Sequence, residues 1–118
     1  MSYYGATSGV IARIGTGTSG STGEADTIAS DVENLAGSSY KDQLYGNGGP
    51  NKLIGDNGAD KLVGNGGVDT LLGGAGADTL NTGGDGLKDS SSCGTQADIA
   101  NADKLDAVAA DCETVKRS

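Results

Sequence analysis

A leucine recurs every nine residues through the middle of the chain. The leucines of this column are Leu35, Leu44, Leu53, Leu62, Leu71 and Leu80. An acidic residue or an asparagine precedes each leucine by two places, and a glycine begins each nine-residue unit from Gly37 to Gly73. A regular period of this kind predicts a solenoid, in which each repeat packs only against its neighbours.

Each unit divides into a turn of six residues and a strand of three. Glycines at positions one and four of the unit allow the positive φ angles of a tight turn, and the apolar residues at positions eight and nine favour extended backbone. Two units therefore make one flattened coil of about 18 residues, and the strands of alternate units stack into two parallel sheets. The position-eight leucines of both sheets would face one another and form a thin core.

The composition excludes a conventional globular core. The chain has 118 residues, the length of one domain, but it contains 22 Gly, no Phe and no Trp. Its formal net charge of -8 would repel nucleic acid and anionic membranes and would attract a multivalent cation. No apolar run approaches the roughly 20 residues that a membrane helix needs. We therefore expect an all-β chain that neither binds nucleic acid nor inserts into a membrane.

Position six of the repeat carries the chemistry that points to a metal. Folding the units stacks the position-six carboxylates at about the 4.8 Å spacing of sheet strands, where like charges repel. Carboxylates and the exposed carbonyls of glycine turns form the oxygen-rich ligand set that Ca²⁺ prefers, whereas zinc is disfavoured because the chain has no His. An alternative is that these side chains only cap the turns through hydrogen bonds. That alternative explains single copies better than it explains a regular ladder.

The unit Gly73–Asn81, with the sequence GGAGADTLN, resembles the nonapeptide G-G-x-G-x-D-x-U-x of the RTX, or haemolysin-type, calcium-binding repeat. The resemblance covers roughly residues 33–81. It implies a parallel β-roll, a right-handed β-solenoid with Ca²⁺ between stacked turns, and each ion would be shared by a unit and the unit two further on. Carried over to this chain, the resemblance pairs Asp42 with Asp60 and Asp60 with Asp78 on one edge, and Asn51 with Asp69 on the other.

The candidate ligands of roughly three to five Ca²⁺ ions are side chains and carbonyls of the turns. They are Asp42, Asn51, Asp60, Asp69, Asp78 and Asp89, together with Asp56, Asn57, Gly46, Gly48, Gly49, Gly55, Gly58, Gly64, Gly66, Gly67, Gly73, Gly74 and Gly76. Asn51 is neutral and follows Pro50, so its site should be weaker. Tyr40 replaces the position-four glycine of the first turn, which makes that turn doubtful. Asp56 either adds charge to its turn or faces solvent.

The two ends of the array are irregular. We divide the chain into an N-terminal cap (1–27), the nonapeptide roll (28–81), and irregular C-terminal coils with a cap (82–118). Gly9–Gly15 looks like a strand that covers the N-terminal edge of the roll. Residues 26–35 and 106–115 share a pattern with shorter turns, which we expect to be poor in metal. Asp89, Asp98 and Asp106 continue the acidic column at irregular spacing, and Asp85 or Asp89 would complete a site with Asp69.

Cys93 and Cys112 are the two cysteines of the chain and lie 19 residues apart. This separation is close to one coil, so the two residues should fall on adjacent coils within reach of a disulfide. A disulfide would indicate an oxidising compartment, and a free pair of small buried residues is the alternative.

These features favour an extracellular module that folds on binding Ca²⁺ and has a structural or adhesive role. The RTX resemblance implies bacterial secretion. An alternative is calcium-dependent self-assembly through the roll ends or through the outward apolar residues at position nine, which are Tyr45, Ile54, Val63 and Leu72. Those residues can also reflect β-propensity with partial cover by neighbours. We expect no enzyme, because the chain lacks His and its carboxylates lie where a metal needs them.

Overall fold

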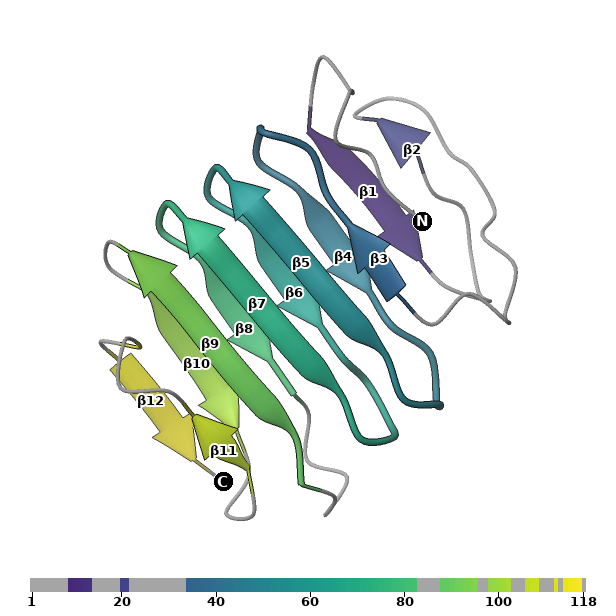
Figure 1. Ribbon diagram of the computed structural model, residues 1–118, viewed down its shortest axis with the longest axis vertical. Coiled ribbons are helices and arrows are strands. Elements are labelled where there is room, and N and C mark those ends of the chain that lie inside the picture. The colour runs from purple at the N-terminus through teal and green to yellow at the C-terminus, as the bar shows by residue number, and fades with distance from the viewer. Residues whose placement is uncertain are drawn as a thin grey trace.

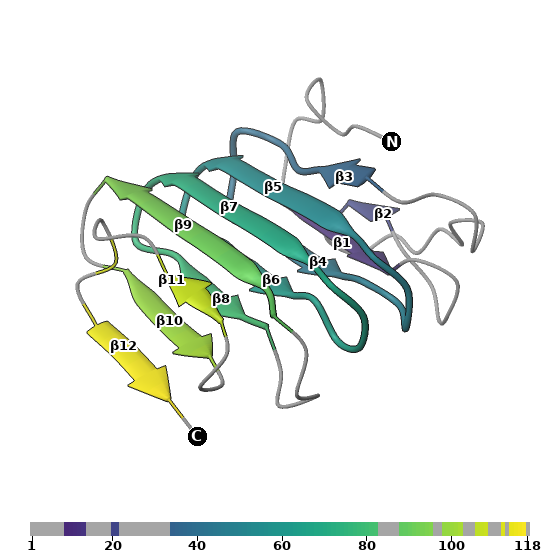
Figure 2. The same ribbon diagram turned by 60° about the horizontal axis from the view of Figure 1, so that its bottom comes forward.

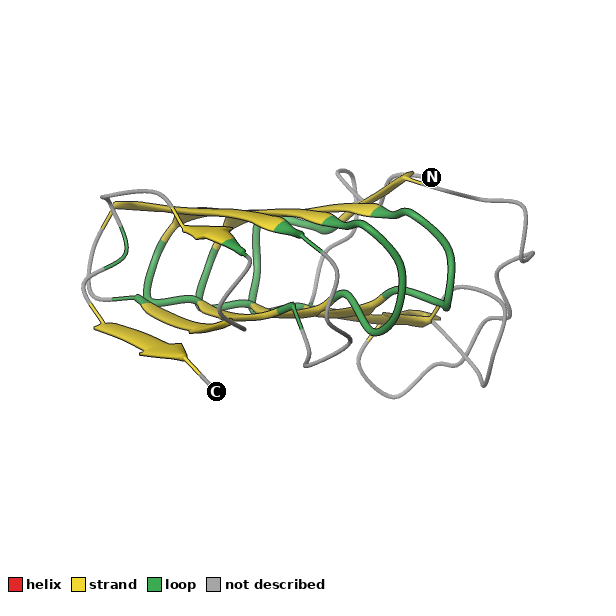
Figure 3. Cartoon of the chain, turned by 90° about the horizontal axis from the view of Figure 1, so that it is seen from below, coloured by secondary structure: helices red, strands yellow, loops and turns green. Residues whose placement is uncertain are grey.

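A computed structural model of the chain describes residues 9–13, 20–21, 34–82, 88–95, 98–102, 106–108, 112 and 114–117. Over these residues the chain is all β, without a helix, and its strands stack into a flattened solenoid (Figure 1). Two sheets face each other and are joined by turns at both edges (Figure 3). The solenoid class predicted from the nine-residue period is confirmed.

The strands alternate between the two sheets along the chain. The five-stranded sheet contains, in spatial order, β11 (Ala107–Val108), β9 (Ser90–Thr95), β7 (Thr70–Ala75), β5 (Lys52–Asn57) and β3 (Asn34–Ala36). The seven-stranded sheet contains β12 (Thr114–Arg117), β10 (Ile99–Ala102), β8 (Thr79–Asn81), β6 (Lys61–Val63), β4 (Gln43–Tyr45), β1 (Val10–Arg13) and β2 (Gly20–Ser21). All neighbouring strands run parallel except β1 and β2, which are antiparallel.

The strand register places each leucine beside the leucine one coil away. Leu53 pairs with Leu35 and Leu71 in one sheet, and Leu62 pairs with Leu44 and Leu80 in the other. All six leucines of the column are 0–1% exposed and form one cluster. The coil of about 18 residues and the thin leucine core are therefore confirmed.

The outward residues at position nine are half-buried. A lysine at position seven stands beside this stripe on each sheet, and both Lys52 and Lys61 are exposed. The ammonium nitrogen of Lys61 lies 5.9 Å from the centre of the Tyr45 ring, which allows a cation–π contact. Lysine stems thus give the apolar stripe part of its cover.

The two ends are completed differently. At the N-terminal end, β1 adds to β4 and extends the seven-stranded sheet, as the sequence predicted. At the C-terminal end, β9 to β12 continue both sheets, and β12 lies beside β10 (Figure 2). Cys93 and Cys112 form a disulfide, with their Cα atoms 5.1 Å apart. The shorter-turn segment 26–35 lies outside the described residues, apart from its last two.

Replacing one leucine of the column should destabilise the roll more than replacing its outward neighbour. We expect Leu62→Ala to lower the free energy of unfolding of the calcium-saturated protein by about 2–5 kcal/mol, because Leu62 is fully buried between two coils. The matched control Val63→Ala, in the same strand but half-buried, should cost about 1 kcal/mol or less. Urea denaturation measures both, and equal losses would contradict the thin core.

Candidate metal centre

Each coil contributes one turn to each edge of the roll. The first edge contains the turns between β3 and β4, β5 and β6, and β7 and β8, and Asp98 extends it. The second edge contains the turns between β4 and β5 and between β6 and β7, and Asp89 and Asp106 extend it. The position-six residues are Asp42, Asp60, Asp78 and Asp98 on the first edge, and Asn51, Asp69, Asp89 and Asp106 on the second. All eight side chains are buried.

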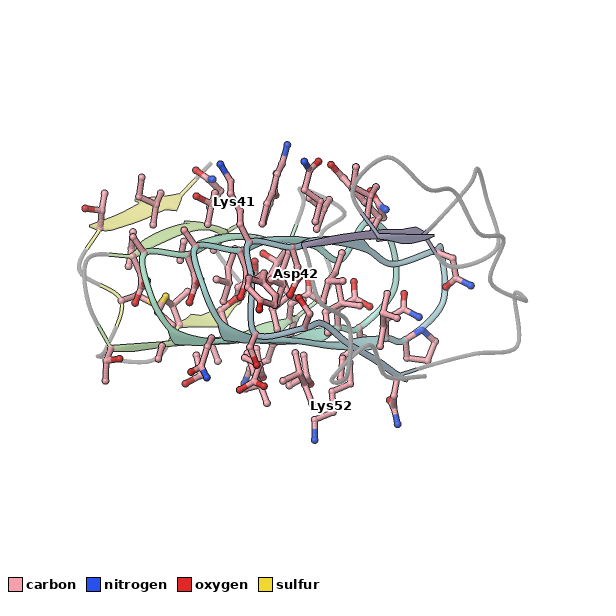
Figure 4. The ribbon with its side chains drawn as sticks, turned by 90° about the horizontal axis from the view of Figure 1, so that it is seen from above. Lys41, Asp42 and Lys52 are labelled. Carbon is pink, nitrogen blue, oxygen red and sulfur yellow. A yellow bond between two sulfur atoms is a disulfide. The ribbon has the colours of Figure 1, made fainter. Side chains whose placement is uncertain are left out.

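The carboxylates point into the roll because strand alternation places position six on the same face as the position-eight leucine. Figure 4 shows Asp42 directed between the sheets, whereas Lys41 points outward. Asp42 is fully buried and Lys41 is exposed. The turns thus bury their position-six side chains, which are acids except for Asn51, while Lys41 remains in water.

A ladder of hydrogen bonds runs along each edge. The backbone N–H of each position-six residue donates to Oδ1 of the position-six carboxylate one coil later. On the first edge these bonds join Asp42 to Asp60 (2.8 Å), Asp60 to Asp78 (2.9 Å) and Asp78 to Asp98 (2.7 Å). On the second edge they join Asn51 to Asp69 (2.8 Å), Asp69 to Asp89 (2.6 Å) and Asp89 to Asp106 (2.9 Å). The residues that the RTX resemblance pairs are therefore neighbours, and Asp89 does stack on Asp69.

The ladder uses only one oxygen of each carboxylate. Oδ2 of Asp60 and Oδ2 of Asp78 are buried and accept no hydrogen bond. A buried carboxylate oxygen without a partner is costly, since it loses water and gains nothing in exchange. The turn-capping interpretation does not account for these two residues.

The position-one glycine of each turn makes room for this second oxygen. A Cβ atom on Gly55 would lie 2.5 Å from Oδ2 of Asp60 and 2.7 Å from the carbonyl oxygen of Gly73 in the next coil. A Cβ on Gly73 would lie 2.6 Å from Oδ2 of Asp78 and 2.6 Å from the carbonyl oxygen of Cys93. We call this space beside a position-one glycine an oxygen cradle. A carboxylate of one coil and a carbonyl of the next converge there, which is a donor set that suits Ca²⁺.

Burial disfavours the charged form of these acids. The pKa of Asp60 is raised from 3.8 to about 8, chiefly by burial and also by the negative charges of Asp42, Asp78 and Asp56, while its backbone hydrogen bond acts in the opposite direction. Burial likewise raises the pKa of Asp78 to about 6, with an added contribution from the charge of Asp98. Ionised carboxylates therefore need a cation beside them.

Protein donors bind the position-six side chains at three of the four ladder ends, which are Asp42, Asn51 and Asp106. Ser38 donates its backbone N–H to Oδ2 and its hydroxyl to Oδ1 of Asp42, both at 2.7 Å. The Thr82 hydroxyl donates to Oδ2 of Asp106 at 2.5 Å. Oδ1 of the neutral Asn51 accepts from the N–H of Asn47 at 2.8 Å. Turn capping thus explains Asp42, although not Asp60 or Asp78.

The remaining predicted residues lie in the turns as follows. The position-one glycines Gly46, Gly55, Gly64 and Gly73 are buried, whereas Gly48, Gly49, Asn57, Gly58, Gly66, Gly67, Gly74 and Gly76 are half-buried or exposed. Asp56 is half-buried with a φ of 77°, and its charge makes the smallest of the contributions to the pKa of Asp60. Asp85 lies outside the described residues.

Asp98 and Asp106 were recognised from sequence only as part of the acidic column and not as candidate ligands. The irregular spacing of that column was the one signal for them.

Within the described ranges, no group of three or more Asp, Glu or Cys side chains is arranged to hold a metal ion. A metal in these turns would therefore need backbone carbonyls as well as carboxylates, and the oxygen cradles provide both.

A parallel β-solenoid whose turns carry buried carboxylates and converging carbonyls is, as a class, a calcium-binding β-roll. Residues 29–62, 36–71 and 54–86 each match the model of the RTX calcium-binding nonapeptide repeat, which spans four copies. Residues 29–86 of the chain are therefore RTX calcium-binding nonapeptide repeats. No curated protein matches the chain significantly.

Adding a methyl group in an oxygen cradle should impair the site. Gly55→Ala would place a carbon against Oδ2 of Asp60 and the Gly73 carbonyl, so we expect calcium affinity to fall about ten-fold or more, on the order of 1–3 kcal/mol. Gly48→Ala is the matched control, because nothing lies within 4 Å of a Cβ there. Calorimetric titration with Ca²⁺ compares the two variants. Equal affinities would show that the cradle is not the binding site.

The raised pKa values make the metal-free roll sensitive to pH. The protonated carboxyls of Asp60 and Asp78 are favoured in the folded state, so their contribution to stability is complete below pH about 4 and is lost as pH rises through 6 and then 8. In EDTA, the β-sheet circular dichroism signal should therefore weaken from pH 4 to pH 8. The double variant Asp60→Asn/Asp78→Asn should lose much of this dependence. A signal that strengthens with rising pH in EDTA would refute the assignment.

Proposed function

We propose that the chain is an extracellular calcium-binding module that folds into its roll when Ca²⁺ binds, and that the folded roll has a structural or adhesive role. The observation that carries this proposal is the buried, unpartnered Oδ2 of Asp60 and of Asp78. Ionising these groups at neutral pH without a cation is unfavourable, since an unpaired charge would remain in the interior. A divalent cation removes that penalty at several turns at once.

The ligands would come from the oxygen cradles. Asp60 with the Gly73 carbonyl, and Asp69 beside Gly64, would hold ions on the first and second edges respectively. Carbonyls of the glycine turns would complete each oxygen set. Asp42 and Asn51 would contribute less, because their side-chain oxygens already accept hydrogen bonds from their own turns. The ion itself supplies the positive charge that lets stacked carboxylates ionise together.

Two features support a location outside the cell. Calcium is about millimolar in extracellular fluids, within the affinity range of extracellular sites, so folding would follow export. The Cys93–Cys112 disulfide fits an oxidising compartment. Within the part of the chain that the structure describes, no helix has the length and hydropathy to cross a membrane.

A binding role is favoured over catalysis. The chain has no His to act as a general base, and its described carboxylates at position six are buried inside the roll. In the part of the chain that the structure describes, the leucine column fills the interior between the two sheets.

A second candidate function is calcium-dependent self-association through the C-terminal end of the roll. Val115 of β12 is in register with the buried Ala100 of β10, yet Val115 is 40% exposed. An inward position that stays exposed leaves apolar surface at the end of the core, where a second roll could stack. Light scattering distinguishes this candidate: assembly that disappears with EDTA supports it, and a calcium-loaded monomer at high concentration rejects it.

Calcium should induce folding, and the interior ladder should dominate the response. We expect the β-sheet circular dichroism signal of EDTA-treated protein to rise on adding Ca²⁺ at pH 7.5. Asp60→Asn should raise the calcium midpoint about ten-fold or more, equivalent to about 1.4 kcal/mol per factor of ten. Asp56→Asn removes the same charge from the same turn but outside the ladder, and it should have a clearly smaller effect.

Two results of this titration would count against the proposal. A full β-sheet signal in EDTA at pH 7.5 that does not change with Ca²⁺ would reject calcium-induced folding. Equal midpoints for Asp60→Asn and Asp56→Asn would reject the ladder as the place where the ion acts.

A further inference from the structure

The roll continues beyond the part of the chain that matches the RTX repeat. That match ends at residue 86, yet β9 and β10 keep the register of the coil before them. Gly94 pairs with Gly74 and adopts the same positive φ, 96° against 99°. Asp98 is 1% exposed and joins the first-edge ladder through its hydrogen bond from the Asp78 N–H. A coil without the repeat sequence therefore reproduces the turn that carries the acids.

An oxygen cradle lies between this coil and the last recognised repeat. Oδ2 of Asp78 is buried, accepts no hydrogen bond and points to the space beside Gly73. The carbonyl oxygen of Cys93 bounds the other side of that space. Asp98 supplies the second carboxylate of the pair and already acts electrostatically on Asp78. The Asp78 carboxylate and the Cys93 carbonyl converge here as the Asp60 carboxylate and the Gly73 carbonyl do beside Gly55, and Asp98 is bonded to the Asp78 N–H as Asp78 is to that of Asp60.

The coil that supplies the Cys93 carbonyl is weakly held by apolar packing. Ser91 and Ala100 stand in register with Leu71 and Leu80, so two small residues replace two core leucines. Shorter side chains bury less apolar area and contribute correspondingly less to stability. The Cys93–Cys112 disulfide lies in the same core cluster and links this coil to the next. The disulfide therefore compensates for the two missing leucines, and it does so at Cys93, whose carbonyl oxygen faces Asp78.

We propose that Asp78, Asp98 and the carbonyl oxygen of Cys93 form a calcium site between the last recognised repeat and the coil that follows it, and that the Cys93–Cys112 disulfide sets the affinity of this site. The inference rests on the proposed calcium-binding function and adds to it one calcium site whose affinity depends on the redox state of the cysteines. Reduction by a dithiol transfers two electrons and two protons to the disulfide, giving two thiols and the oxidised dithiol. The freed coil no longer holds its carbonyl against Asp78, and the site weakens.

The test counts bound ions by native mass spectrometry and measures their affinities by calorimetry. Four samples are compared: the oxidised protein, the Cys93→Ala/Cys112→Ala variant, the Asp98→Asn variant, and the variant that combines all three substitutions. The cysteine variant and the Asp98→Asn variant should each lose one ion, or bind one class of ion at least ten-fold more weakly, relative to the oxidised protein. The combined variant should lose no further ion, because both changes act on the same site. The Cys93→Ala/Cys112→Ala variant keeps the backbone carbonyl of residue 93. An ion lost in this variant would therefore be due to the absence of the disulfide.

Asp60→Asn serves as the control that separates two kinds of failure. If the oxidised protein binds no Ca²⁺, the proposed function itself fails. If Asp60→Asn loses ions while Asp98→Asn and the cysteine variant keep the full count and affinity, only the redox-dependent site is overturned. Additive losses in the combined variant would also overturn it, since the disulfide would then act elsewhere.

Thermodynamic linkage provides a second readout that does not need Asp98→Asn to fold. Calcium must favour the disulfide by the same factor by which the disulfide favours the ion. In a glutathione redox buffer, the ratio of disulfide protein to dithiol protein at equilibrium should be about ten-fold or more higher with Ca²⁺ than with Mg²⁺. A thiol–disulfide equilibrium that Ca²⁺ leaves unchanged would contradict the proposal.

Discussion

Neutralisation of the carboxylates that the turns bury is the constraint on which the roll depends. Oδ1 of Asp60 accepts the backbone N–H of Asp42, so the acid that stacks the coils is also part of their hydrogen-bond ladder. Its Oδ2 lies unpartnered in the interior, and its pKa rises to about 8 because burial opposes ionisation. Two other features of the repeat serve this arrangement. The position-one glycines leave room for the carboxylate, and the leucine column excludes water around it.

Two of the outermost acids of the ladders, Asp42 and Asp106, accept hydrogen bonds from protein side chains. Ser38 satisfies both carboxylate oxygens of Asp42, and Thr82 donates its hydroxyl to Asp106. Thr82 occupies a position-one site, because its N–H bonds to the coil beyond as that of Gly64 does. Cys93 holds the equivalent place on the first edge and forms a disulfide. Side chains replace glycine where the cradles stop, which limits the length of the array.

Much of this fold could be predicted because the nine-residue period specifies it. The spacing of Leu35 to Leu80 predicted the two sheets, and the Asp column predicted which residues become neighbours. The ladder of N–H to Oδ1 bonds could not be predicted, because it depends on side-chain rotamers and on the distance between coils. The coil of β9 and β10 was predicted only as irregular, because Ser91 and Ala100 stand where leucine is expected. A serine in a turn is common, so Ser38 gave no signal of its bond to Asp42.

The position of the ions is the most direct test of this account. Crystals of the calcium-loaded protein, measured at a wavelength where Ca²⁺ scatters anomalously, would locate each ion without reference to a model. The account predicts an anomalous peak about 2.3–2.6 Å from Oδ2 of Asp60, beside Gly55 and the Gly73 carbonyl. Ions found only on exposed acids, with no peak at Asp60, would contradict it.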